Sequence, residues 1–95
     1  MDELTKRRLA HNEALFRAVN EEIEENRSSG DEQAYVCECV DPECALTIEL
    51  TAREYELVRA RADRFVVAPG HVLPAVEHVV AREPEYTIVE KDVPV

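Results

Sequence analysis

The stretch "VCECVDPEC", residues 36–44, contains all three cysteines of this 95-residue chain. Residues i and i+2 of an extended strand point to the same side, so Cys37 and Cys39 direct their sulfurs to one face while Glu38 faces away. The turn that follows, "VDPE", folds the chain back and lets Cys44 approach the same point. Three converging sulfurs suit the tetrahedral coordination of zinc, so this stretch predicts a zinc-knuckle-like loop.

A structural zinc site needs a fourth ligand, and the chain has only three cysteines. His71 is the first candidate because it directly follows Pro69-Gly70, a tight turn that can present the ring to a neighbouring loop. A water molecule in the fourth position would instead make the site open. The predicted ligand set is Cys37, Cys39, Cys44 and His71, and the alternatives for the fourth ligand are His78, then His11, or the carboxylate of Asp41 or Glu43.

The charge around the cysteines favours a bound metal ion. Residues 31–50 carry six acids and no base, and negative neighbours raise the pKa of a thiol. A bound dication would offset this charge, and its ligation energy would become folding energy, on the order of 10 kcal/mol. Two other interpretations stay open: the cysteines pack as small core residues, or they form a redox pair, which acidic neighbours disfavour. The acids near the cysteines that we expect to raise the pKa of the thiols are Glu38, Asp41, Glu43 and Glu49.

The N-terminal segment predicts one long amphipathic helix, placed at residues 1–27. Residues 3–26 contain neither proline nor glycine and repeat apolar residues at helical spacing. Asn12 and Asn20 lie beside this apolar stripe, and we expect them at the edge of water because a buried amide needs hydrogen-bond partners. The helix would cover its own domain or pack against a partner or sister chain. The expected inward residues are Leu9, Phe16, Val19 and Ile23.

The rest of the chain predicts a small antiparallel sheet of about four or five strands that carries a second short helix. Thr51 and Glu54 fit a capping box at the start of that helix, whose narrow apolar face would contain Tyr55, Val58 and Ala62. The expected strands are 34–39, 45–50 (with Leu46, Ile48 and Leu50 on one face), 64–68, and a hairpin of 76–82 and 86–91, for which a helical turn at 76–81 is the alternative.

These elements predict an α+β fold in a single domain, residues 1–95. A polar linker at 28–33 would join the long helix to a zinc-stabilised α+β core at 34–95.

Composition narrows the classes of partner. The chain has 21 acids and 11 bases and a net charge of −10, so it should repel nucleic-acid phosphates rather than bind them directly. Protein partners with basic patches fit this charge better. We expect a cytoplasmic protein without membrane contact, because the sequence shows neither a long apolar run nor a secretion signal.

Several motifs together resemble a group of small actinobacterial proteins. They are "NEALFRAVNEEIEE", "CECVDPEC", "IELTAREYELVRA" and "RFVVAPGH", and the similarity extends over about residues 8–91. The resemblance implies that Cys37, Cys39, Cys44 and His71 belong to one pattern. It implies no activity, because none is established for the group.

The sequence therefore indicates a small zinc-binding protein whose structural metal site supports a protein-interaction or regulatory surface. The partner would be an unidentified protein or a second copy bound through the N-terminal helix. The alternatives are a zinc-dependent hydrolytic enzyme, with Glu43 or His78 as its general base, and an acidic regulator of a nucleic-acid enzyme. Catalysis is the less favoured class because no known catalytic motif occurs and the chain has only two glycines.

Overall fold

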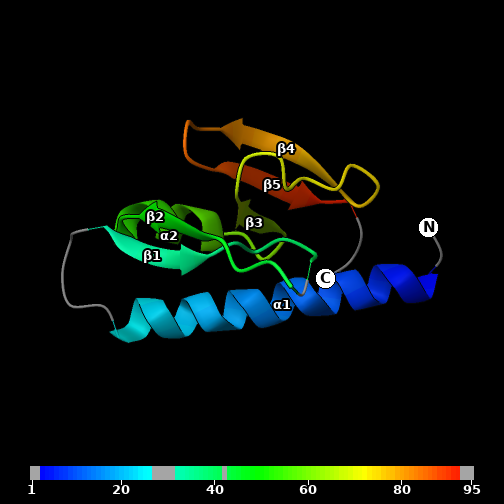
Figure 1. Ribbon diagram of the computed structural model, residues 1–95, viewed down its shortest axis with the longest axis horizontal. Helices are drawn as coiled ribbons and strands as arrows, with labels where there is room; N and C mark the ends of the chain where they lie inside the picture. The colour runs from blue at the N-terminus through cyan, green and yellow to red at the C-terminus, as the bar shows by residue number, and fades with distance from the viewer. Residues whose placement is uncertain (1–2, 27–31, 42, 93–95) are drawn as a thin grey trace.

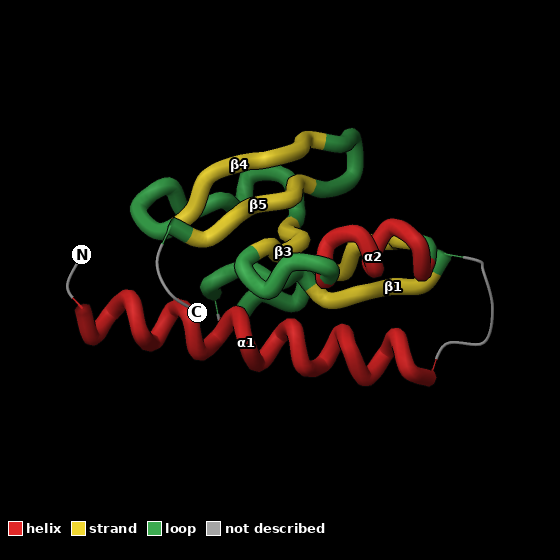
Figure 2. Tube along the Cα trace, turned by 180° about the vertical axis from the view of Figure 1, so that it is seen from behind, coloured by secondary structure: helices red, strands yellow, loops and turns green. Residues whose placement is uncertain are grey.

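The computed structural model describes residues 3–26, 32–41 and 43–92. The helix α1 runs along one edge of the molecule, and all the other elements lie on the same side of this helix (Figure 1). The view from behind shows the same arrangement, with β1 along the C-terminal half of α1 (Figure 2). In chain order the elements are α1 (Glu3–Asn26), β1 (Gln33–Val36), β2 (Thr47–Leu50), α2 (Ala52–Arg59), β3 (Arg64–Val67), β4 (Glu77–Arg82) and β5 (Thr87–Lys91).

The α+β class is confirmed, but the strands form two sheets rather than one. The strands β1 and β2 make an antiparallel pair, and the second sheet has the order β3-β5-β4 with antiparallel neighbours throughout. The expected hairpin is present as β4 and β5, and a bulge lies between Val79 and Ala81. Alternating apolar residues predicted the strands correctly, but such a pattern does not specify which strands pair.

The first two strands are shorter than predicted. The strand β1 ends at Val36, so the cysteines follow it in a loop, and β2 begins only at Thr47. Leu46 therefore lies outside β2 and is 50% exposed, whereas Ile48 and Leu50 are buried as expected. Residues 28–31 of the predicted linker, and residue 27 of the predicted helix, lie outside the described residues, and Gln33 already belongs to β1.

The second helix begins with the predicted capping box. The backbone N–H of Glu54 donates to Thr51 Oγ1 (3.1 Å), and Thr51 N–H donates to Glu54 Oε1 (2.8 Å). Tyr55 and Val58 are buried, but α2 ends at Arg59, so Ala62 lies beyond the helix and is exposed. The Tyr55 ring stacks on Tyr35 from β1 with the centroids 4.5 Å apart, and this pair attaches α2 to the first sheet.

The helix α1 packs on the core through a face that is partly polar. Phe16 and Ile23 are half-buried as predicted, but Val19 is 44% exposed and points away from the core, and the side chain of Leu9 lies outside the described residues. Asn20 is completely buried, so its expected position at the edge of water is wrong.

Asn20 is buried because its amide pairs with a strand backbone. Its Oδ1 accepts the N–H of Val36 (2.7 Å) and its Nδ2 donates to the Val36 carbonyl (2.8 Å). The side chain thus supplies the donor and the acceptor that a further strand would offer to β1, and the amide has the partners that burial requires.

The carboxylate of Glu38 joins three elements of the fold, α1, α2 and β3. It is fully buried and accepts hydrogen bonds from Asn20 Nδ2 (2.9 Å), the Tyr55 hydroxyl (2.7 Å) and the Val66 N–H (3.0 Å). The Arg17 guanidinium lies 3.6 Å away and stacks 4.2 Å above the Phe65 ring. Burial raises the pKa of this carboxyl, whereas Arg17 and the three hydrogen bonds act in the opposite direction.

Glu38 also closes the free edge of β3. Its backbone N–H donates to the Val66 carbonyl (2.8 Å), while its side chain accepts the Val66 N–H. The loop after β1 therefore provides hydrogen-bond partners for the Val66 N–H and carbonyl at the edge of β3, although it does not form a regular strand. This contact connects the two sheets.

A second buried ionic cluster attaches α1 to the last strand. The Lys91 ammonium from β5 contacts the carboxylates of Glu13 on α1 and Glu77 on β4, and all three side chains are almost completely buried. Glu77 also accepts the Leu73 N–H (3.0 Å). The single ammonium is the opposite charge for both carboxylates, and a buried ion without such a partner would be costly. Within the described residues, no helix combines the length and the apolar character needed to cross a membrane.

Glu38→Gln should lower the free energy of unfolding by about 3–5 kcal/mol, because it leaves Arg17 buried without its counter-charge and turns an amide donor toward other donors. Urea denaturation followed by circular dichroism would measure the change. Glu49→Gln is the matched control on the exposed face of β2, where we expect a change below about 0.5 kcal/mol. Equal stabilities of the two variants would contradict the role given to Glu38.

Candidate metal centre

The structure brings the four predicted metal ligands together. The ligand atoms of Cys37, Cys39, Cys44 and His71 all lie within 4.8 Å of one another. The cysteines belong to the loop between β1 and β2, and the histidine belongs to the loop between β3 and β4. Cys37 and Cys39 are buried, whereas Cys44 and His71 are half-buried. The group thus connects two loops that are distant in sequence.

Backbone hydrogen bonds shape the loop that carries the cysteines. The Cys37 N–H donates to the Leu46 carbonyl (3.0 Å), which extends the β1–β2 pairing by one bond, and the Cys44 N–H donates to the Asp41 carbonyl (3.1 Å). Asp41 Oδ1 also accepts the Glu43 N–H (2.9 Å), a local bond typical of aspartate in turns. The expected turn is present, although Pro42 itself lies outside the described residues.

A tight turn after β3 presents His71. The His71 N–H donates to the Ala68 carbonyl (3.0 Å), which closes the turn across Pro69 and Gly70. Gly70 has a φ of +85°, a conformation that residues with a Cβ rarely adopt. The Pro-Gly pair therefore places the histidine as the sequence predicted.

The distances within the group fit one central ion. His71 Nδ1 lies 3.7 Å from Cys37 Sγ and 3.6 Å from Cys44 Sγ. In a tetrahedral zinc site, bonds of about 2.3 Å to sulfur and about 2.0 Å to nitrogen place these atoms about 3.6 Å apart. A single hydrogen bond would bring one sulfur closer than the other, whereas a shared ion would hold both at nearly equal distances.

Burial favours the protonated form of Cys37 and Cys39. It raises the pKa of Cys37 far above its ordinary value, the nearby sulfurs of Cys39 and Cys44 add to this shift, and the Ala68 N–H, which donates to Cys37 Sγ (3.1 Å), opposes it. Burial also raises the pKa of Cys39. The direction agrees with the sequence analysis but the leading cause differs, because Glu38 turns into the core instead of lying beside the sulfurs.

The other candidate ligands do not belong to this group. His78 lies on β4, with Nδ1 2.6 Å from Asp92 Oδ1 and Nε2 3.5 Å from Glu90 Oε2. His11 is exposed on α1. The carboxylates of Asp41 and Glu43 are exposed and lie outside the four-residue group, so neither supplies a fourth ligand in this geometry. With four protein ligands the centre resembles a closed, structural site rather than an open, catalytic one.

Two asparagines of α1 hold the cysteine loop, and the sequence analysis missed this role. Asn12 Nδ2 donates to the Val40 carbonyl (3.2 Å), while Asn20 pairs with Val36 immediately before the first cysteine. The pair was visible in the sequence as two amides on one side of the apolar stripe. The sequence pattern did not identify their hydrogen-bond partners, because these belong to a segment distant along the chain.

Comparison with protein-family models, curated proteins and solved structures found no match to this chain. What the centre can do is therefore inferred from its own residues.

In the presence of a chelator and without denaturant, iodoacetamide should modify Cys44 before Cys37 and Cys39. Cys44 is half-buried, whereas the other two are 1% and 2% exposed. Peptide mapping by mass spectrometry would give the order of reaction, and urea should make the three rates similar. Modification of Cys37 or Cys39 first would contradict the burial described here.

Proposed function

We propose that this chain is a small zinc protein whose Cys3His centre is structural and whose role is protein interaction or regulation. The nearly equal approach of His71 Nδ1 to two sulfurs, at 3.6 and 3.7 Å, is the observation that supports a shared ion most directly. Three thiolates and one imidazole form a donor set that suits zinc better than hard cations such as Mg²⁺ or Ca²⁺.

A structural role follows from where the ligands lie. An ion held by Cys44 and His71 cross-links the loop after β1 to the loop after β3, and both loops also contact each other through Ala68 N–H and Cys37 Sγ. Metal ligation of this kind contributes on the order of 10 kcal/mol to folding, which is comparable to the whole stability of a small domain. Zinc would therefore decide whether the two loops keep their shape.

The hydrolytic alternative has less support in this geometry. Four protein ligands leave no coordination position for a reacting water molecule. The proposed bases also lack a suitable arrangement: Glu43 is exposed and outside the ligand group, and the ring of His78 is engaged by Asp92 and Glu90.

An interaction role is supported by the way the centre is connected to α1. Glu38 lies between two ligands in sequence, and its carboxylate binds Arg17 and Asn20 of the helix. The ion thus stabilises the loop on which α1 docks, and α1 presents Leu15 and Val19 outward, 52% and 44% exposed. A metal ion that fixes the position of an exposed helix is expected in a protein that binds a partner rather than in an enzyme.

Protein purified without added metal should contain one equivalent of zinc, and Cys44→Ser or His71→Ala should reduce this content and lower the thermal midpoint. Elemental analysis and calorimetry on the same samples would show both effects. His78→Ala and His11→Ala are the matched controls, and each should retain the full equivalent.

Two results would separate the parts of this proposal. Full zinc retention in His71→Ala would move the fourth ligand elsewhere. Protein that contains no zinc and is not stabilised when zinc is added would refute the metal site.

A further inference from the structure

The outward face of α1 is exposed along the length of the helix. In Figure 1 the other elements lie on one side of α1, which leaves its opposite side uncovered by the described chain. The side chains on that face recur every three or four residues, the spacing by which one helix packs along another. They are Arg8, His11, Leu15, Ala18, Glu22 and Glu25, all exposed.

Charge changes sign along this face. The N-terminal part carries bases, the middle part is apolar, and the C-terminal part carries acids. Arg8 and Glu25 lie at nearly equal distances on either side of the apolar middle. This order is complementary to itself when a second identical helix runs in the opposite direction.

We propose that α1 binds α1 of a second copy of this chain as an antiparallel pair related by a two-fold axis. One register satisfies the whole face: Arg8 of each copy lies opposite Glu25 of the other, and His11 lies opposite Glu22. The apolar centre then aligns in the same register, with Leu15 of each copy opposite Ala18 of the other. A two-fold axis makes every such contact occur twice.

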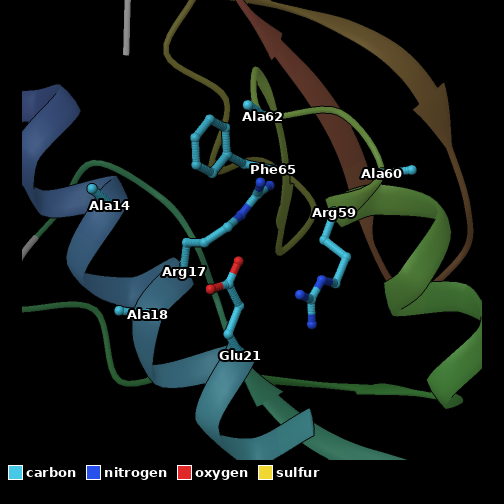
Figure 3. Close-up of a pocket in the computed structure, with 8 residues that line it drawn as sticks. All are labelled: Ala14, Arg17, Ala18, Glu21, Arg59, Ala60, Ala62 and Phe65. Carbon is cyan, nitrogen blue, oxygen red and sulfur yellow. The ribbon is translucent and has the colours of Figure 1, made fainter. Parts of the chain in front are cut away.

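Small residues allow the two helices to approach closely. Ala18 lies at the centre of the outward face and Ala14 lies beside it, and both border a groove of about 420 Å³ between α1 and the end of α2. Figure 3 shows these two alanines on the α1 side of the groove, with Ala60 and Ala62 on the far side.

The pairing requires no rearrangement of the fold. The opposite face of α1 stays docked through Asn20, Arg17 and Glu13, whose partners lie within the same chain. This inference deepens the proposed function by naming the partner of the interaction surface. It rests on the proposed interaction role, but it does not depend on the identity of the metal.

Charge reversal at the two ends of the face tests the register. At low salt, sedimentation equilibrium from micromolar to millimolar concentration should show a monomer–dimer equilibrium of the wild-type chain. Arg8→Glu or Glu25→Arg should each weaken the dimer about tenfold, because two attractive pairs become repulsive. The double variant Arg8→Glu with Glu25→Arg should restore the wild-type affinity, and high salt should reduce the difference between variants.

Arg82→Glu on β4 is the control for the same change of net charge at an exposed position, and it should leave the affinity within about twofold of wild type. A monomer at every concentration, or dimerisation that the single variants leave unchanged, would overturn the proposal. Failure of the double variant to restore affinity would refute the antiparallel register.

Zinc content measured on the same samples separates this inference from the metal proposal. Protein with one zinc equivalent that stays monomeric overturns the pairing alone. Protein that pairs as described but holds no zinc overturns the metal site alone.

Discussion

The carboxylate of Glu38 is the interaction on which the rest of the structure depends. It is enclosed by donors from α1, α2 and β3, and no solvent reaches it. A carboxylate removed from water is tolerated only when its lone pairs and its charge are matched. The positions of the three elements around it are therefore constrained together, because displacing any one of them leaves a buried polar group without its partner.

This constraint reaches the candidate metal centre through the local geometry of the chain. Adjacent residues of extended backbone project to opposite sides, so the segment Cys37-Glu38-Cys39 sends two sulfurs toward His71 and one carboxylate toward the core. The same segment also pairs with the edge of β3 at Val66, and the Ala68 N–H just beyond this strand donates to Cys37 Sγ. One short piece of backbone thus links the centre, the second sheet and the long helix, and the stability of each depends on the other two.

The sequence predicted that Cys37, Cys39, Cys44 and His71 lie close together, because the two turns that present them depend on neighbouring residues. It also predicted the capping box of α2 and the final hairpin, which depend on neighbouring residues. It did not predict the division into two sheets, since alternating apolar residues indicate strands without naming their neighbours. The same limit applies to Val19, which satisfies the helical period of the inward stripe yet faces outward.

Burial of polar side chains was the other point that sequence reasoning could not anticipate. Glu38, Asn20, Glu13 and Lys91 belong to residue types that are mostly exposed, so composition alone places them at the surface. Their partners come from segments far away in the sequence, such as Val66 for Glu38 and Val36 for Asn20. Only the folded arrangement shows that each charge or amide has a match, and this matching makes their burial possible.

The contact between Glu13 and Lys91 has a consequence for how the chain is made. Synthesis proceeds from the N-terminus, so the ribosome delivers α1 well before β5. An isolated helix is only marginally stable in water, and the carboxylate of Glu13 stays hydrated until the ammonium of Lys91 arrives. The helix α1 must therefore wait for β5 before this contact can form, so its docking is completed only after the later strand has been made.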